Sequence, residues 1–187
     1  MPAASASRTT CSENAPRGAA EAQLGALTAL DGSDMAASGS AACTGGRAGI
    51  GACMNTLMQL KANATGLPVA FVVRRILSST DKDEILRFIQ SVPHASGQNY
   101  IIGIKGEVYD FEASCNKVVR FDPKNANGTV YHTNHPVAND DLKDWYKQPE
   151  KGNSSIRLAS VQGHIATLPN AKDADIKAAL RAKDDPS

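Results

Sequence analysis

The stretch QNYIIGIKGEVYDFE, residues 98–112, decides the fold class of this chain of 187 residues. Residues 98–104 and 107–112 each have the composition of a β-strand, and Lys105-Gly106 between them is a two-residue hairpin signal. The stretch therefore predicts two neighbouring strands of an antiparallel sheet.

The segments on both sides of this hairpin complete an α+β layout. Further strands are expected at residues 48–55, 117–121 and 129–133. Apolar residues at helical spacing, together with helix-capping residues, predict helices at residues 69–77, 80–92, 153–168 and 173–183. Because the strands between residues 98 and 133 follow one another without an intervening helix, we expect them to form an antiparallel sheet.

The second strand of the hairpin alternates carboxylates with rings. Asp110 and Glu112 occupy alternate positions, and Tyr109 and Phe111 occupy the others. Since successive side chains of a strand point to opposite faces, we expect the two carboxylates on a solvated face and the rings opposite them.

The first 47 residues differ from the rest in composition. They are rich in Ala, Gly and Ser, and the first aromatic residue of the chain is Phe71. Alanine buries too little apolar area to offset the entropy lost when the backbone is ordered. We therefore expect residues 1–47 to be a low-complexity tail, disordered or unrelated to the domain, and residues 48–187 to form a partial domain.

Charge, hydropathy and cysteine spacing bear on location and partners. A net charge of +1 gives no broad electrostatic attraction for nucleic acid. No apolar run approaches the ~20 residues that span a bilayer, and the N-terminus has no apolar core of a secretory signal. Cys11, Cys43, Cys53 and Cys115 match no zinc or C-x-x-C pattern, which favours reduced cysteines. These features predict a cytoplasmic protein without nucleic-acid or membrane partners.

Site chemistry is most concentrated in YHTNHP, residues 131–136. Metal binding is disfavoured, because His132 and His135 would point to opposite faces of a strand and no acidic or cysteine ligand lies nearby in sequence. A second interpretation is structural: Asn134 caps a turn and the histidines bond to buried carbonyls. The third is catalytic, with the Asn134 carboxamide donating to an oxyanion during acyl transfer, and it requires a nucleophile elsewhere.

Several segments resemble one family of enzymes. They are GLP (66–68) leading into the helix at 69–77, NY (99–100), DFE (110–112), VYHTNH (130–135), NDDL (139–142) and SSIRLASV (154–161). Together they resemble the acyl-CoA:6-aminopenicillanic acid acyltransferase (isopenicillin-N acyltransferase)-like cysteine hydrolases. The resemblance covers about residues 48–185, and its most specific part is His-Thr-Asn-His.

The resemblance implies an N-terminal-nucleophile hydrolase with an αββα sandwich, here incomplete, in which helices pack on an antiparallel sheet. In that family a precursor cleaves itself to expose an N-terminal cysteine, which attacks an amide or thioester carbonyl while its own α-amine serves as the base. Asn134 matches the family's oxyanion-hole asparagine, with His132, Thr133 and His135 in support. The resemblance implies no metal and no organic cofactor.

The sequence assigns no nucleophile. Cys43 is followed by Thr44 and preceded by small residues, as a family nucleophile would be. It nevertheless lies directly before the matched strand, with no room for the strands that separate the two in the family. Cys53 is expected to be inert in a buried strand, and Cys115 to lie in a turn. We expect the chain to hold the central part of such a domain.

Two functional classes remain open beside a purely structural α+β protein. The first is a cysteine amidohydrolase or acyltransferase that acts on a small-molecule amide or acyl thioester. The second is a catalytically inactive fragment or binding module that lacks the nucleophile. An incomplete sandwich also exposes sheet edges, which predicts self-association through the exposed sheet.

Overall fold

A computed structural model describes the side chains of most residues from Gly49 to Ala182. Side chains are described for residues 49–104, 106–122, 129–146, 153–166, 168 and 171–182, except that of Asp173. Only the backbone is described for residues 25–27, 29–30, 34–35 and 42–45. Helices and strands both occur in these residues, and they form a mixed α+β architecture.

The larger sheet is antiparallel, with five strands in the described residues in the order β4-β5-β6-β7-β8. These strands are β4 (Ala42–Gly45), β5 (Ile50–Thr56), β6 (Gln98–Ile104), β7 (Glu107–Ala113) and β8 (Val118–Arg120). The hairpin of β6 and β7 turns at Gly106, whose φ of 83° lies in the region that favours glycine. The predicted hairpin is confirmed.

A second, smaller layer pairs β1 (Gly25–Leu27) with β9 (Val130–His132) in antiparallel fashion. The strand expected at 129–133 is thus present as β9, but the prediction that it shares a sheet with the three strands before it is wrong. The connection between β8 and β9 carries the chain from one sheet to the other, which the order of strands in the sequence does not reveal. A separate short pair joins β2 (Ala29–Leu30) to β3 (Asp34–Met35).

Strands β1 to β4 all lie in the segment whose composition predicts a tail. Their backbone pairing links this segment to the domain at two places, through Leu27 opposite Val130 and through Cys43 opposite Cys53. The domain boundary at residue 47 stays a prediction.

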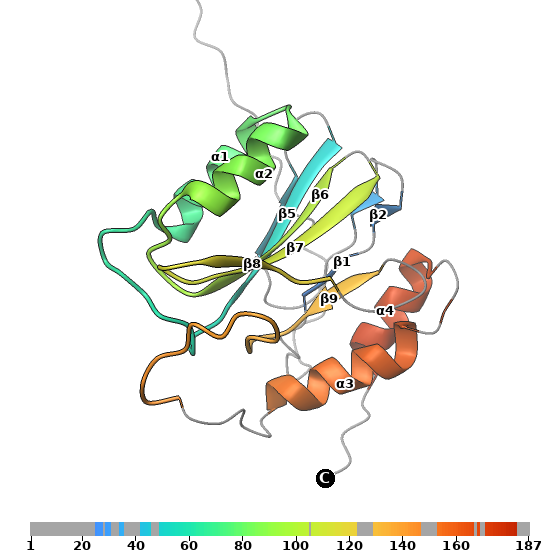
Figure 1. Cartoon of the computed structure of the whole chain (residues 1–187). Helices are drawn as coiled ribbons and strands as arrows, with labels where there is room; N and C mark the ends of the chain where they lie inside the picture. The colour runs from blue at the N-terminus through green and yellow to red at the C-terminus, as the bar shows by residue number, and fades with distance from the viewer. Residues whose placement is uncertain are drawn as a thin grey trace, which may run out of the picture.

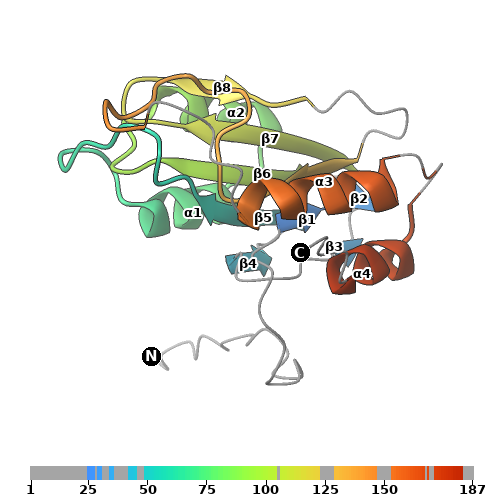
Figure 2. The same cartoon turned by 90° about the horizontal axis from the view of Figure 1, so that it is seen from below.

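Helices cover the outer faces of both sheets. On one side lie α1 (Val69–Ser78), which follows Pro68, and α2 (Lys82–Ser91), whose first turn is capped by the Asp81 carboxylate. On the other side lie α3 (Asn153–Ile165) and α4 (Asp173–Arg181) (Figure 1). Figure 2 shows α3 and α4 near one another, and α3 contacts β9.

Three apolar clusters in the described residues hold these layers together, and the smallest joins Cys53 and Ile101 of the larger sheet to Val130 of β9. The first lies between the larger sheet and the first helix pair, where Tyr100, Ile102 and Phe111 pack against Val72, Val73, Ile76, Ile85 and Ile89. The second lies beneath β9, where Tyr131 packs against Val161, Ile165 and Ile176. The resulting order is helix, sheet, sheet, helix, so the expected α+β fold with αββα layers is confirmed.

No helix in the described part of the chain combines the length and the apolar character needed to cross a membrane.

Candidate active site

A buried polar layer lies between the two sheets. Asn99, Asp110, Glu112 and His132 each have an exposed fraction of 0%. The expectation that Asp110 and Glu112 face solvent is wrong, although their alternation with the rings is right. The second sheet covers the face on which these two carboxylates lie.

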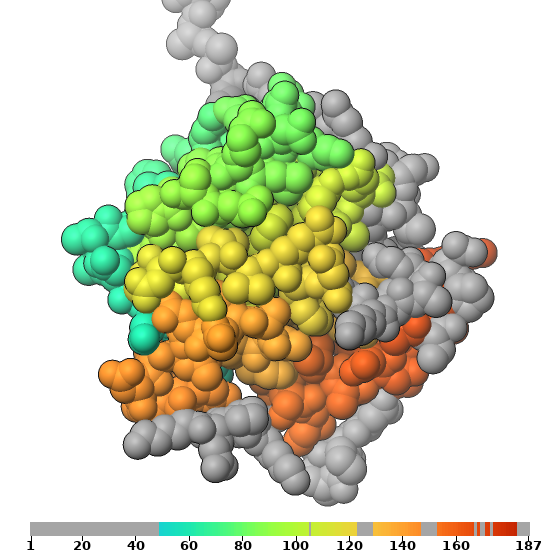
Figure 3. Space-filling model, viewed as in Figure 1, coloured from blue at the N-terminus to red at the C-terminus, as the bar shows by residue number. Residues whose placement is uncertain are grey.

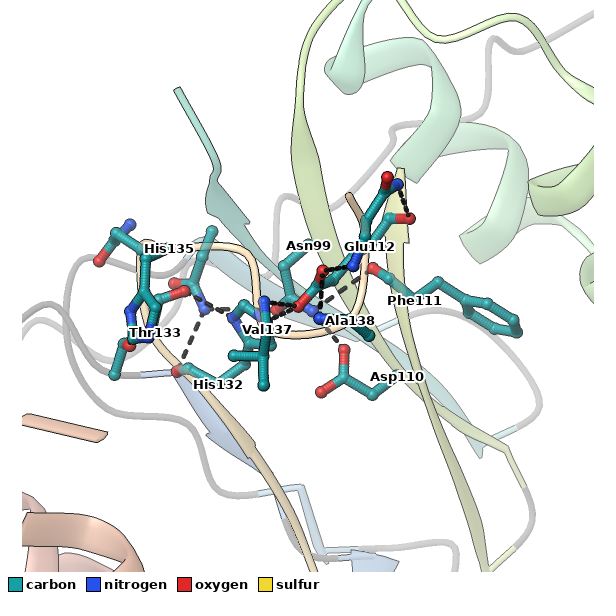
Figure 4. A network of polar contacts seen from close by, with 12 residues as sticks. Asn99, Asp110, Phe111, Glu112, His132, Thr133, His135, Val137 and Ala138 are labelled. Atoms are coloured by element: carbon teal, nitrogen blue, oxygen red, sulfur yellow. Dashed lines mark hydrogen bonds and ion pairs between the residues drawn. The ribbon is translucent and has the colours of Figure 1, made fainter. Parts of the chain in front are cut away.

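Glu112 accepts four hydrogen bonds with its two carboxylate oxygens. Its Oε1 accepts from His132 Nε2 at 2.7 Å and from the backbone N–H of Val137 at 2.6 Å. Its Oε2 accepts from the backbone N–H groups of Ala138 at 3.0 Å and Asn139 at 2.7 Å. Figure 4 shows His132 of β9, and Val137 and Ala138 of the segment after it, converging on the carboxylate.

His132 is held between two acceptors. Its Nδ1 lies 2.6 Å from the carbonyl oxygen of Thr133, and its Nε2 lies 2.7 Å from Glu112. Both ring nitrogens therefore donate, which requires the doubly protonated imidazolium. Burial alone would lower the pKa of His132, but the Glu112 carboxylate and Asp110 outweigh burial and raise it.

The same pairing acts in the opposite direction on Glu112. Burial works to raise its pKa, but the hydrogen bond and positive charge of His132 and the amides of Val137 and Asn139 outweigh burial and lower it. Glu112 and His132 thus form a buried ion pair.

Asp110 lies on the same face, two residues before Glu112, and its environment is different. One oxygen accepts from Asn99 Nδ2, whereas Oδ2 has no hydrogen-bond partner in the described residues. Burial raises the pKa of Asp110 to about 7, and the nearby His132 charge only partly offsets this. Asp110 is therefore a buried acid that is readily protonated near neutral pH.

Asn134 follows β9 in a turn that is docked on the first turn of α3. The backbone N–H of Asn134 donates to Ser154 Oγ at 2.8 Å, and Thr133 Oγ1 donates to the Ser154 carbonyl at 3.0 Å. His135 Nδ1 lies 2.8 Å from Ser154 Oγ. Burial and the nearby His132 charge lower the pKa of His135, which favours the neutral form of its ring.

The carboxamide of Asn134 makes only long contacts. Its Nδ2 lies 3.4 Å from the Thr56 carbonyl, and its Oδ1 lies 3.4 Å from Arg157 Nη2. In addition, Gln59 Nε2 lies 3.4 Å from the Asn134 backbone carbonyl. The amide group is partly exposed and weakly engaged, so its N–H₂ is available to a ligand.

The loop that follows Thr56, the last residue of β5, carries Gln59 and is held close to the start of β6. A Cβ atom at Gly97 would lie 2.2 Å from the Leu57 carbonyl oxygen, so no larger residue allows this approach. The backbone N–H of Leu57 donates to the Gly97 carbonyl at 3.0 Å. This contact positions the loop next to Asn134.

Sequence reasoning misses three residues of this region. It places Glu112 in solvent, gives Gln59 no role, and includes Arg157 only as part of the family resemblance. Arg157 has no hydrogen-bond partner for its buried Nη1 in the described residues, and burial lowers the pKa of its guanidinium. No local motif marks these residues, because their contacts with the turn join segments more than 20 residues apart.

The cysteines are distributed differently from expectation. Cys53 is disulfide-bonded and 2% exposed, so the prediction of reduced cysteines is wrong for this residue. Cys43 lies opposite Cys53 in the register of β4 and β5, and only its backbone is described. Cys115 is free and partly exposed, and Cys11 lies outside the described residues.

The described side chains include no cluster of three or more His, Cys, Asp or Glu residues able to hold a metal ion. His132 bonds to Glu112 and His135 approaches Ser154 Oγ, so the two rings engage different partners. Figure 3 shows the segment that follows β9, in orange, between the yellow strands of the larger sheet and the red-orange α3.

These features define an α+β protein with αββα layers, in which a polar site lies where β7, β9 and α3 meet. The sequence matches the family of the acyl-coenzyme A:6-aminopenicillanic acid acyl-transferase over residues 47–185, and the chain belongs to this family. A search of curated proteins gives no match.

Proposed function

We propose that this chain carries the acyl-binding part of a cysteine amidohydrolase or acyltransferase, in which Asn134 donates to the oxyanion. The substrate class is a small-molecule amide or acyl thioester, in keeping with the acyl transfer in the family's description. The observation that carries the proposal is the carboxamide of Asn134: it is partly exposed and makes only long contacts, on a turn whose backbone is bonded to both β7 and α3.

The proposed chemistry is nucleophilic acyl transfer. A cysteine thiolate attacks the carbonyl carbon, and the carbonyl electron pair moves onto oxygen, where Asn134 Nδ2 donates a hydrogen bond. The intermediate collapses with loss of the amine or thiol, which takes a proton, and leaves an acyl-cysteine. Water or an acceptor amine then releases the acyl group and restores the thiol.

The neighbours of Asn134 have supporting roles in this proposal. Thr133 and His135 bond to Ser154 and set the position of the turn, whereas His132 connects the turn to Glu112. His132 does not exchange a proton during turnover, because both of its ring nitrogens already donate to buried acceptors.

Replacement of Asn134 tests the role of the oxyanion donor. In a chain with thioesterase or amidase activity, Asn134→Ala should lower kcat by about a hundredfold or more, because one oxyanion donor contributes roughly 3 kcal/mol to the barrier. Steady-state hydrolysis of a chromogenic amide and a short acyl thioester measures this change. Asn116→Ala, a replacement of an exposed asparagine, is the matched control. An unchanged kcat would remove Asn134 from the mechanism.

Intact-mass analysis tests whether the nucleophile belongs to this chain. Cleavage directly before Cys43, or an acyl adduct on a peptide that begins with Cys43, would assign Cys43 as the nucleophile. The measurement is made with and without a reductant, since a thiol held in a disulfide cannot attack. An unchanged mass and no labelling by a thiol-reactive acyl analogue would favour the inactive fragment or binding module.

A further inference from the structure

We propose that Glu112 is the positioning residue of the Asn134 turn, a single buried carboxylate that holds the chain on both sides of the oxyanion donor. The inference deepens the proposed function, on which it rests. Before Asn134, Glu112 binds the imidazolium of His132; after Asn134, it binds the backbone amides of Val137, Ala138 and Asn139.

The carboxylate is saturated by these contacts. Two carboxylate oxygens offer about four lone-pair positions, and the four donors, at 2.6 to 3.0 Å, occupy them. All four partners are N–H groups, so an ionised acceptor-only side chain is required. A glutamine has the same shape, but its N–H₂ group would replace one of the two oxygens. That group would then face two N–H donors and could accept from neither.

The side chain of Asn139 strengthens the same attachment. Its Nδ2 donates to the backbone carbonyl of Glu112 at 2.9 Å, and its Oδ1 accepts from the backbone N–H of Asp141 at 3.0 Å. Asp141 in turn accepts from Ser114 Oγ at 2.6 Å. The chain downstream of Asn134 is therefore fastened along the end of β7, with Glu112 as its charged contact.

The attachment to α3 is separate from the attachment to β7. Ser154 contacts residues 133–135, whereas Glu112 contacts His132 and residues 137–139. Because the two sets do not overlap, loss of Glu112 should release the chain on both sides of Asn134, at His132 and at residues 137–139, and leave Ser154 as the one attachment that keeps residues 133–135 near α3. The expected result is a displaced carboxamide in a chain that remains folded.

Amide hydrogen exchange in the full chain, followed by NMR, tests this inference. Glu112→Gln should accelerate exchange at Val137, Ala138 and Asn139 by tenfold or more relative to amides of β6, and should shift the Asn134 side-chain amide resonances. Asp110→Asn is the matched control, because it lies on the same strand and face but accepts nothing from this segment. Unchanged relative protection at residues 137–139 in folded Glu112→Gln would overturn the inference.

A second variant covers the case in which Glu112→Gln does not fold. Glu112→Asp keeps the charge but shortens the side chain by one methylene, so it should retain some of the four contacts and lose others. We expect faster exchange at one or two of the three amides. Full protection at all three would overturn the inference.

Activity measurements separate this inference from the proposed function. If the chain hydrolyses acyl substrates, Glu112→Gln should lower kcat at least tenfold with a smaller change in KM, since the displaced group acts on the transition state. A wild-type chain without any activity would contradict the proposed function and leave the exchange result, and hence the role of Glu112, standing. An active Glu112→Gln variant with wild-type kcat would contradict the positioning role.

Discussion

The two faces of strand β7 carry opposite kinds of chemistry. On the face toward α1 and α2, Phe111 joins an apolar cluster with Tyr100 and Ile102. On the face toward β9, Asp110 and Glu112 lie in a polar layer that is just as inaccessible to solvent. The apolar face is held by contact area. The polar face is held by directed hydrogen bonds around Glu112, beside a small apolar contact of Val108 with the cluster that contains Val130.

This difference predicts how each face responds to substitution. Apolar packing tolerates changes that keep volume and shape, because no single atom is indispensable. A buried charge that lacks its partner is destabilising whatever its shape, because it has lost both its water and its counter-ion. The polar layer should therefore be sensitive to charge and hydrogen bonding, and the apolar layer to volume.

The largest effect should come from the isosteric change Glu112→Gln. It leaves the His132 imidazolium without its counter-ion and should lower the free energy of unfolding by about 3–5 kcal/mol. Urea denaturation at pH 6 measures the change. Phe111→Leu, a change on the opposite face of the same strand, is the control and should cost less than about 1.5 kcal/mol. Equal losses for the two variants would contradict the distinction between the faces.

The sequence predicts the elements much better than it predicts this distinction. The hairpin, the capped start of α2 and the apolar spacing of α1 are local signals, and the structure confirms each of them. The alternation of carboxylates and rings along β7 is also visible in the sequence. The sequence does not show which face of the strand is covered by another layer. A strand with carboxylates at alternate positions predicts a solvated face unless another layer lies over it, and that layer comes from β9 and β1, distant in sequence.

The site is predictable only in part for the same reason. Asn134 is found from its motif and the family resemblance, and its catalytic role stays a prediction. The connection of its turn to Glu112 joins segments about 20 residues apart, and its contact with Arg157 joins the end of β9 to α3. Such contacts depend on how the layers are stacked, which no local spacing encodes.

The second effect concerns pH, and it should separate Asp110 from Glu112. Asp110 has a raised pKa of about 7 against 3.8 for the free side chain, so between these values the folded state binds more protons than the unfolded state. The contribution of Asp110 to the free energy of unfolding therefore falls as the pH rises from about 4 to about 7, by about 1.4 kcal/mol per pH unit. Asp110→Asn removes this dependence.

Unfolding free energies at pH 4.5, 6 and 7.5 measure the difference between wild type and Asp110→Asn. The difference should move in favour of the variant as the pH rises. Glu112 and His132 have pH dependences of their own. The lowered pKa of Glu112 adds stability that is lost at acid pH. The raised pKa of His132 adds stability that is lost as the pH rises through the pKa of the folded state. Both remain in the variant, so a pH-independent difference would mean that Asp110 is not a buried, neutralised acid.

The smallest effect should come from Ile102→Val on the apolar face. Ile102 is fully buried between the larger sheet and the helices α1 and α2, and the change removes one methylene without introducing a polar atom. The loss should be about 1 kcal/mol, with the same value at pH 4.5 and pH 7.5 because no nearby group changes its protonation. Exchange at the amides of Val137 and Asn139 should stay at its wild-type rate relative to β6. A pH-dependent loss, or faster exchange at these amides, would show that the apolar layer sets the Asn134 turn, and the two faces of β7 would then act as one unit.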